Sequence, residues 1–335
     1  MSIGDVRLRA AVEAVSKGTR LVRELQRDID RLPTLEKPDA SPVTAADLAV
    51  QALVAVHLRS LLGGAAILGE ESSAILREPG AERVLDAVVA AVRRHEPDAA
   101  ADDVLAVLGA CDHEASGTFW TLDPIDGTKG FLRGRHCAVA LALVEAGRPV
   151  IGVLGCPRLS PDDAASPDGF DGSGVVAFAA AGEGCWLASV EETTASPRRL
   201  RRAARARGAA PRFCQSGAEG RRTSRFLDEL AASVGARPGW LRVDGQGKYV
   251  LLARGQADAY VRPPRSGGLG EWIWDHAAGA IVAAEAGAVV TDVRGRPLDF
   301  TAGARLARNE GVIGADRDLH ARLVEAASRV EPPPG

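Results

Sequence analysis

The sequence has few cysteines, and their arrangement is typical of neither a structural metal site nor a disulfide framework. The five cysteines are widely spaced, odd in number and never form Cys-x-x-Cys: Cys111, Cys137, Cys156, Cys185 and Cys214. This pattern argues against a zinc ribbon or a disulfide-stapled domain. It predicts reduced, buried thiols and a cytoplasmic location.

Long apolar runs and lysines are also scarce. No stretch of about 18 uncharged apolar residues occurs, which is the length that crosses a bilayer, and the first residues, MSIGDVRLRA, carry charges where a signal peptide needs an apolar core. The net charge is only −3, so the overall field favours neither nucleic acid nor a membrane as a partner. Nearly all positive charge is arginine, because the lysines number four: Lys17, Lys37, Lys129 and Lys248.

The chain has ample material for a packed core. Its 335 residues are 46% hydrophobic and 25% charged, which suits a globular protein of two domains or one large one. The basic stretch 197–208 is a plausible domain junction. Because no aromatic residues are interleaved with its arginines, we interpret it as a solvated face or linker rather than a polyanion-binding patch.

Hydrophobic periodicity divides the chain into helical and strand-rich parts. Helices are expected over 5–30, 44–62 and 275–286, and residues 80–108 are helical with a polar break. Strands are expected over 65–68 and 119–122, and hairpins over 137–154 and 174–187. Beyond residue 208 strands and helices alternate, as in an α/β unit.

The motif Asp123-Pro124-Ile125-Asp126-Gly127-Thr128 follows the strand expected at 119–122. Two carboxylates separated by two residues can converge on one side of a tight loop, and hard cations prefer such oxygen ligands. Gly127 permits close approach of an anion to the backbone, and a helix starting here would point free N–H groups at a phosphate. The alternative interpretation is an Asp-rich capped turn.

Two further acidic positions occur earlier in the chain. Glu70 and Glu71 follow another apolar run, which suggests a metal ligand with a supporting partner or, equally, an exposed acidic loop. Thr44 and Asp47 fit a helix-capping box. The functional interpretation of Asp47 is a carboxylate that orients or deprotonates water.

A third position opens the late helix, in the stretch 272–279. Asp275 looks like an N-cap residue there. His276 is expected to pack or form a hydrogen bond rather than bind a metal. Each of these signals is modest alone, whereas their order along the chain is specific.

With these motifs in place, the chain resembles the lithium-sensitive, magnesium-dependent phosphatase superfamily that includes inositol monophosphatase and fructose-1,6-bisphosphatase. Within it, the closest resemblance is to the 3′(2′),5′-bisphosphate nucleotidase branch, which the Thr-Lys-Gly-Phe after Gly127 favours. The segments that carry the resemblance are 39-DASPVTAADLAVQ-51, 118-TFWTLDPIDGTKGFLRG-134, 152-GVLGCP-157, 248-KYVLLARGQADAYVRP-263 and 274-WDHAAG-279.

The resemblance implies a role for each matching residue. Two or three Mg²⁺ ions would be bound by Glu70, Asp123, Asp126, Asp275 and the carbonyl of Ile125. The water-activating pair would be Asp47 and Thr128. The substrate would be contacted by Gly127, Thr128, Ser216, Lys248, Arg262 and Asp275.

Two departures from the family pattern lie on the nucleotide side. Gly245 stands where the family commonly has serine, and the region 216–224, where a histidine is usual, contains Arg221 and Arg222 instead. Both leave hydrolysis intact and put the base preference and the nucleotide assignment in question.

The implied fold is a layered αβαβα sandwich. An α+β domain over 1–195 would carry most metal ligands, and an α/β domain over 196–335 would complete the substrate pocket. The implied activity is hydrolysis of 3′-phosphoadenosine 5′-phosphate to AMP and phosphate by a metal-activated water. A monomer or homodimer is expected, with a small phosphorylated substrate as its only partner.

Three alternatives are open. An inositol or sugar phosphatase of the same superfamily would use the same metal ligands. Haloacid-dehalogenase-type phosphatases use a nucleophilic aspartate, but their two aspartates are one residue apart and follow an N-terminal strand. A non-catalytic metal- or nucleotide-binding regulator would be expected to lack a ligand or the water-activating pair, and all are present here.

Overall fold

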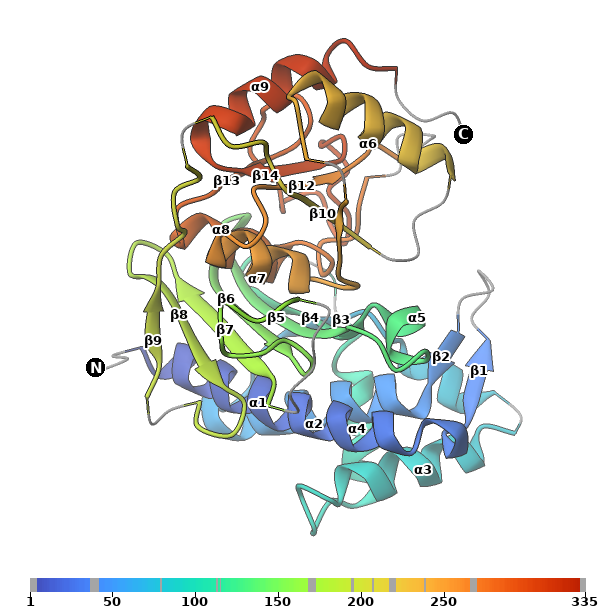
Figure 1. The fold of residues 1–335 in the computed structure, drawn as a ribbon. Helices are drawn as coiled ribbons and strands as arrows, with labels where there is room; N and C mark the ends of the chain where they lie inside the picture. The colour runs from blue at the N-terminus through green and yellow to red at the C-terminus, as the bar shows by residue number, and fades with distance from the viewer. Residues whose placement is uncertain are drawn as a thin grey trace.

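The protein was analysed as a computed structural model, which describes residues 5–36, 42–78, 80–112, 114, 116–167, 173–193, 196–206, 208–216, 221–237, 239–265 and 270–331. Two sheets and four groups of helices account for most of these residues (Figure 1). A short antiparallel hairpin precedes the second helix and consists of β1 (Thr34–Glu36) and β2 (Pro42–Thr44).

The larger sheet has seven strands in the order β3-β4-β5-β6-β7-β8-β9. Only the β3–β4 pair is parallel, and the other neighbours run antiparallel. The two expected hairpins are therefore confirmed as β5–β6 and β7–β8. The strands are β3 (Ile67–Gly69), β4 (Phe119–Asp126), β5 (Ala138–Glu145), β6 (Arg148–Cys156), β7 (Val175–Ala180), β8 (Gly184–Ser189) and β9 (Arg198–Leu200).

One face of this sheet is covered by two long helices. Asp5 caps the first, and a Thr44–Asp47 capping box starts the second, so both begin where the sequence predicts. The helices are α1 (Val6–Arg27) and α2 (Ala45–Leu62), and the outer pair α3 (Glu82–Val92) and α4 (Ala101–Gly109) packs on α2.

The opposite face is covered by α7 (Gly247–Arg254) and α8 (Ala277–Glu285). Glycine makes the close contact possible, because a Cβ on Gly152 of β6 would lie 2.3 Å from Ile281 Cγ2. Similarly, a Cβ on Gly279 would meet the Tyr249 ring at 2.0 Å. These contacts pack α8 closely against the middle of β6 and against α7.

The smaller sheet lies beyond these helices, in the order β11-β10-β12-β14-β13. Its outer face is covered by α6 (Arg221–Ser233) and α9 (Arg317–Ala327). The strands are β10 (Phe213–Gln215), β11 (Leu241–Arg242), β12 (Ala259–Arg262), β13 (Val289–Thr291) and β14 (Val312–Ala315).

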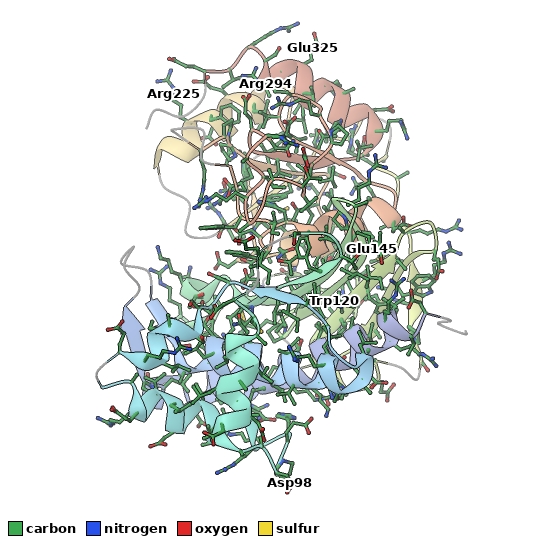
Figure 2. All side chains as sticks on the ribbon, turned by 180° about the vertical axis from the view of Figure 1, so that it is seen from behind. Asp98, Trp120, Glu145, Arg225, Arg294 and Glu325 are labelled. Atoms are coloured by element: carbon green, nitrogen blue, oxygen red, sulfur yellow. The ribbon has the colours of Figure 1, made fainter. Side chains whose placement is uncertain are left out.

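The layers therefore alternate helix, sheet, helix, sheet and helix, and the predicted αβαβα sandwich is confirmed (Figure 1). Seen from behind, side chains fill the space between the layers, and the charged Asp98 and Glu325 lie at opposite ends of the molecule (Figure 2). The division between residues 195 and 196 stays a prediction. Strand β9, just after it, pairs with β8 in the larger sheet.

The basic stretch 197–208 is not uniformly solvated, which corrects the sequence-based interpretation. The Arg202 side chain is only 3% exposed and lies 3.4 Å from the Asp258 carboxylate. It also donates to the carbonyls of Leu252 and Ala257 at 2.7 and 2.8 Å. Arg202 is therefore buried and connects the basic stretch to the end of α7 and to the residues that follow this helix.

The prediction that the cysteines are buried is confirmed for all five. Helix α2 has the length and hydropathy of a membrane span, with 18 residues and a mean hydropathy of 1.4. However, 67% of it is buried inside the protein, where it packs against α1, α3 and α4. Its apolar composition is accounted for by this packing.

Candidate active site

The ends of two parallel strands bring the first pair of predicted ligands together. The register of β3 and β4 places Gly69 opposite Leu122, and the Glu70 amide donates to the Leu122 carbonyl at 3.0 Å. The next residue along each strand, Glu70 and Asp123 respectively, is therefore at the same edge of the sheet.

Helix α2 contributes Asp47 from its first turn. The Asp47 Oδ2 atom accepts hydrogen bonds from the Thr44 amide at 2.8 Å and the Thr44 hydroxyl at 2.6 Å. The Oδ1 atom accepts from the Thr128 hydroxyl at 3.4 Å. One carboxylate thus caps the helix and contacts Thr128. Farther along α2, the Gln51 side chain bonds the amide and carbonyl of Glu71, which ties α2 to the end of β3.

A bulge in β4 displaces the second aspartate of the motif. Asp123 pairs with Ala140 and Asp126 with Ala138, so β4 has one extra residue between these positions. The strand expected to end at Leu122 therefore continues to Asp126. The extra residue changes the direction in which the side chains after Asp123 point.

A short helix, α5 (Thr128–Phe131), begins directly after the bulge, as the motif predicts. Gly127 precedes it with φ of 91°, a left-handed conformation that favours glycine. The Thr128 hydroxyl lies 3.2 Å from the Ile125 carbonyl oxygen. A Cβ on Gly127 would approach the Gly245 amide nitrogen to 3.0 Å, so two loops meet here backbone to backbone.

Asp275 is not the N-cap of α8, which corrects the sequence-based interpretation. The helix begins at Ala277, and His276 occupies the cap position without a side-chain hydrogen bond to the helix. Because the Asp275 carboxylate is not needed for capping, it is available to a ligand. The electrostatic influence of Asp126 and Glu70 on Asp275 places all three carboxylates in one neighbourhood.

This neighbourhood carries an excess of negative charge. Burial, and then the carboxylates of Glu70 and Asp126, raise the pKa of Asp123 well above its usual value. Burial, and then Asp126 and Glu70, do the same for the pKa of Asp275. Burial raises the pKa of Asp126 to about 6, although Lys248 opposes this shift. The protein itself therefore supplies too little positive charge to balance these carboxylates.

These residues fit a hard cation. Asp123 is 1% exposed, and its Oδ1 atom has no hydrogen-bond donor among the residues that the structure describes. A buried carboxylate oxygen without a donor is costly unless a cation supplies the missing charge. The donor set is all oxygen and includes Glu70, Asp126 and Asp275, which suits Mg²⁺ rather than a softer metal.

A cavity of about 110 Å³ opens next to these carboxylates. Six residues predicted from the sequence line it, namely Asp126, Gly127, Ser216, Lys248, Arg262 and Asp275. Two of the predicted metal ligands, Asp126 and Asp275, thus share a cavity with four further predicted substrate contacts, Gly127, Ser216, Lys248 and Arg262. Asp47, Glu70, Asp123 and Thr128 are outside the lining. Asp47 contacts Thr128, the neighbour of the lining residue Gly127, and Glu70 influences the charge of Asp123.

Basic residues line the same cavity as the carboxylates and form what we call its basic wall, Lys248 and Arg262. Lys248 is 7% exposed, and its ammonium group donates to the carbonyls of Val243 at 3.3 Å and Gly245 at 2.6 Å. Because an ammonium group has three donors, these two bonds leave a third for a ligand. The Ser216 hydroxyl donates to Asp244 at 2.5 Å, and so it braces the same loop.

The cavity also contains residues that the sequence reasoning missed. Gln246 donates to the Trp274 carbonyl at 2.8 Å and accepts from the Gly279 amide at 2.9 Å, which fastens the loop before α7 to the start of α8. The Tyr249 hydroxyl lies 2.8 Å from His276 Nδ1. The expectation that His276 forms a hydrogen bond is confirmed. A signal for Tyr249 existed, since it directly follows Lys248 in a recognised segment.

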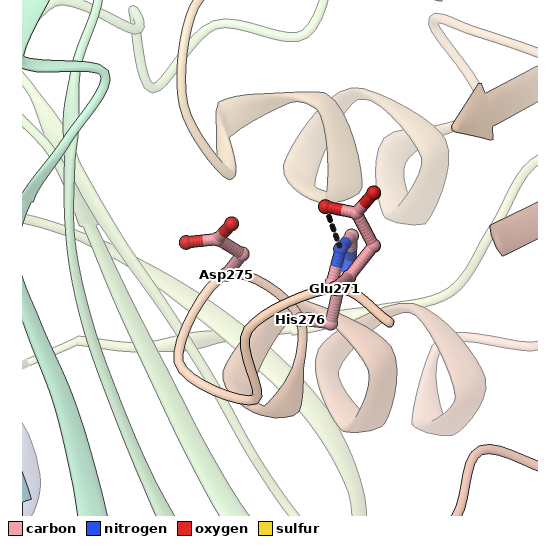
Figure 3. Close-up of side chains that lie close together, drawn as sticks. All are labelled: Glu271, Asp275 and His276. Carbon is pink, nitrogen blue, oxygen red and sulfur yellow. Dashed lines mark ion pairs between the residues drawn. The ribbon is translucent and has the colours of Figure 1, made fainter. Parts of the chain in front are cut away.

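Glu271 was also missed, and its carboxylate lies next to the His276 ring, with Asp275 nearby (Figure 3). Its side chain is 2% exposed and forms ion pairs with Arg262 at 3.4 Å and Arg265 at 3.2 Å. Its carboxylate is 4.0 Å from His276 Nε2. Burial disfavours the charged form, but the neighbouring His276 and the Arg262 charge outweigh it, and the pKa of Glu271 is lowered to about 2. An isolated acid between a glycine and a tryptophan carried no recognisable signal.

The departure at Gly245 has a physical reason. Its φ is 67°, and a Cβ there would lie 2.3 Å from the Asp126 carbonyl oxygen. A serine could not occupy this position without moving the loop away from Asp126. The other departure lies largely outside the described residues, which exclude 217–220 and the side chains of Arg221 and Arg222.

Comparison with known proteins identifies the family and the fold. The model of the inositol monophosphatase family matches residues 5–331. A 3′(2′),5′-bisphosphate nucleotidase of Schizosaccharomyces pombe is 34% identical over 97% of this chain and 96% of its own length. One from Oryza sativa is 37% identical over 95% and 92%. Among solved structures, the extragenic suppressor protein SuhB of Bartonella henselae has a TM-score of 0.64 and 20% identity, over 96% of this chain and 98% of that one.

Proposed function

The chain belongs to the inositol monophosphatase family, and from that premise we propose that it is a magnesium-dependent 3′(2′),5′-bisphosphate nucleotidase. Its substrate would be 3′-phosphoadenosine 5′-phosphate, hydrolysed to AMP and phosphate. The observation that carries the proposal is the cluster of buried, mutually repelling carboxylates beside a cavity that Lys248 and Arg262 also line. Such a site suits a phosphate ester bound between cations and cationic side chains.

Glu70, Asp123, Asp126, Asp275 and the Ile125 carbonyl would hold two or three Mg²⁺ ions. When bound, such ions neutralise phosphate charge and lower the pKa of a coordinated water. Asp123 supports this assignment best, because its buried Oδ1 lacks a donor among the described residues.

The remaining chemistry falls to Asp47 and Thr128. A water that hydrogen-bonds to the Thr128 hydroxyl would lose its proton to Asp47 through that hydroxyl as its oxygen attacks phosphorus. The 3.4 Å contact between Thr128 Oγ1 and Asp47 Oδ1 supports this relay. The bond from phosphorus to the 3′-oxygen breaks on the opposite side, and no phosphoenzyme forms.

The substrate would be held by backbone and side-chain donors around the cavity. The N–H groups of Gly127 and Thr128 would bond the phosphate that is hydrolysed. Lys248 and Arg262, on the basic wall, and Ser216 would contact the nucleotide. Asp275 would lie between the metal ions and the substrate.

A side-by-side assay tests the proposal. Initial rates would be measured with 3′-phosphoadenosine 5′-phosphate, inositol 1-phosphate and fructose 1,6-bisphosphate over a magnesium titration. We expect the nucleotide to have the highest kcat/KM and activity to vanish with a chelator. A higher kcat/KM for inositol 1-phosphate would make the chain an inositol phosphatase, and nucleotide binding without turnover would make it a regulator.

We also propose a cytoplasmic location, which the burial of all five cysteines and the absence of a Cys-x-x-Cys pair in the sequence support. A monomer or homodimer that binds neither nucleic acid nor membrane is the expected state. Size-exclusion chromatography with light scattering measures the oligomeric state. Fractionation of cells that express the tagged chain measures the location.

A further inference from the structure

Gln51 is a fully buried amide on α2 whose two polar atoms both bond the backbone of another segment. Its Nε2 atom donates to the Glu71 carbonyl at 2.6 Å, and its Oε1 atom accepts from the Glu71 amide at 3.1 Å. Buried backbone groups need such partners, and here a single side chain supplies both. Gln51 therefore fixes the position of Glu71 relative to α2.

The segment that Gln51 holds is the one that carries Glu70. Strand β3 ends at Gly69, and the Glu70 amide donates to the Leu122 carbonyl of β4 at 3.0 Å. At the next residue, Glu71, the backbone bonds Gln51 of α2 instead of the sheet. Glu70 thus lies between a bond to the sheet and a pair of bonds to a helix.

Gly69 leaves the room that this amide needs. A Cβ at position 69 would lie 2.4 Å from Gln51 Oε1 and 2.8 Å from Gln51 Nε2. A larger residue would push the amide away from Glu71, because the end of a long side chain moves more easily than a paired strand. Two positions far apart in the sequence, 51 and 69, are therefore fitted to one contact.

The same helix carries Asp47 one turn before Gln51. Residues at i and i+4 lie on one face of a helix, and both side chains are buried. Asp47 Oδ1 accepts from the Thr128 hydroxyl at 3.4 Å, while Gln51 bonds the residue after Glu70. Helix α2 is thus a rigid spacer between the proposed water-activating pair and a proposed metal ligand.

Another buried glutamine makes the same kind of contact beside Asp275. Gln246 donates to the Trp274 carbonyl at 2.8 Å and accepts from the Gly279 amide at 2.9 Å. Like Glu70, Asp275 lies outside the helices and strands, whereas Asp123 and Asp126 are held within β4 by its pairing with β5. Because Gln246 also lines the cavity and Gln51 does not, Gln51 isolates the effect of position from any contact with substrate.

We propose that Gln51 is a positioning residue for magnesium binding, which holds Glu70 level with Asp123 and at a fixed spacing from Asp47. The β3–β4 register, with Gly69 opposite Leu122, makes Glu70 and Asp123 neighbours at the sheet edge. The proposal rests on the proposed function, in which Glu70 binds the metal. Removing a residue that orients a metal ligand weakens metal binding or activity by about 10- to 100-fold.

The test is calorimetric titration of the full chain with Mg²⁺ in the absence of substrate. In Gln51→Met, which keeps the length of the side chain and removes both bonds, the dissociation constant for magnesium should rise about 10- to 100-fold. The magnesium concentration for half-maximal activity should rise in parallel, while kcat and KM at saturating magnesium stay within about threefold. A dissociation constant within about threefold of wild type would overturn the role.

Gly69→Ala tests the same contact from the other side. Its Cβ would displace the Gln51 amide and leave the glutamine in the chain, so the dissociation constant for magnesium should rise by up to about tenfold. This variant also decides the question if Gln51→Met does not fold. Wild-type affinity in a folded Gly69→Ala protein would count against the proposal.

Asn309→Leu is the matched control. Asn309 is also a buried amide that bonds two backbone groups, the Pro297 carbonyl at 2.9 Å and the Asp299 amide at 2.7 Å. It lines a separate cavity of about 380 Å³ to which none of the predicted site residues contributes. The change should lower the melting temperature and leave magnesium affinity unchanged. Equal weakening of magnesium binding in Asn309→Leu would mean that lost stability, and not position, explains the effect at Gln51.

The outcomes also separate this proposal from the proposed function. If the wild-type protein binds magnesium but hydrolyses no phosphate ester, the proposed function fails, and the calorimetric comparison still decides the role of Gln51. Wild-type protein that binds no magnesium would overturn both proposals.

Discussion

The active-site region contains two groups of buried carboxylates with opposite electrostatic environments, a carboxylate wall of Glu70, Asp123, Asp126 and Asp275 and a basic wall in which Glu271 pairs with Arg262 and Arg265. The wall formed by β3, β4 and α8 gathers carboxylates that raise one another's pKa, as Asp123 and Asp275 show. On the wall behind β12, Glu271 is matched to two arginines, and its pKa falls to about 2. The first wall is incomplete without added cations, whereas the second carries its own counter-charge. Metal binding and substrate recognition are therefore separable by mutation.

The largest effect is expected from Asp123→Asn on the carboxylate wall. Loss of one charged ligand should reduce kcat/KM at least about a thousandfold, because metal ions contribute several kcal/mol of transition-state stabilisation. The same change should raise the free energy of unfolding of the metal-free protein by about 1–3 kcal/mol, since it removes an uncompensated buried charge. Steady-state rates and urea unfolding in a chelator measure the two effects.

Near-normal turnover in Asp123→Asn would contradict the site assignment. The sharper control is Asp258→Asn, which removes a carboxylate that is equally buried but paired with Arg202 and Arg212. That variant should become less stable and keep its activity. Opposite signs of the two stability changes would confirm that only one of these carboxylates needs an external cation.

A second prediction concerns the hydroxyl of Thr128. Thr128→Val keeps the shape and removes the group that contacts Asp47, so kcat should fall about 100- to 10,000-fold. Thr128→Ser keeps the hydroxyl and should remain within about tenfold of wild type. Thr44→Ala provides a control for the capping role of Asp47, with a stability loss of about 1 kcal/mol. Equal loss of kcat in the Val and Ser variants would argue against the proton relay.

The carboxylate wall could be predicted from the sequence because its residues follow apolar runs that must be strands. Glu70 and Asp123 each come directly after such a run, and parallel strands end at the same edge. The bulge that carries the strand on to Asp126 was not predicted, because register depends on the facing residues of β5. Asp275 was misjudged as a helix cap, since spacing alone does not tell which residue starts a helix.

Residues of the basic wall were predicted only where they lie in a segment that resembles the family, as Lys248 and Arg262 do. Gln246 contacts residues about 30 positions away in the sequence, and Glu271 contacts residues across a loop. Neither kind of contact follows the periodicity of a helix or a strand, so the sequence does not predict it. Gly245 looked like a departure in the sequence, and the structure gives its reason in the backbone contact with Asp126. Long-range backbone contacts of this kind arise from the packing of α7 and α8 on the sheet and leave no local pattern.

The smallest expected effect is also the most direct comparison of the two walls, since their contributions to stability should change with pH in opposite directions. Asp126 has its folded-state pKa raised from 3.8 to about 6. In metal-free protein its stabilising contribution is complete below pH 3.8 and is lost as pH rises through 6. Glu271 has its pKa lowered from 4.5 to about 2, so its contribution is complete above pH 4.5 and is lost as pH falls toward 2.

Urea unfolding in a chelator at pH values from 3 to 7 would separate these two contributions. Relative to Asp126→Asn, wild type should lose up to about 3 kcal/mol of unfolding free energy between pH 4 and 6. Relative to Glu271→Gln, its advantage should shrink by up to about 3 kcal/mol as pH falls below 4.5. Saturating magnesium should abolish the first difference, because bound cations keep Asp126 ionised, and leave the second unchanged. A magnesium effect on the Glu271 difference would mean that the two walls share their ions, and that metal binding and substrate recognition are one function.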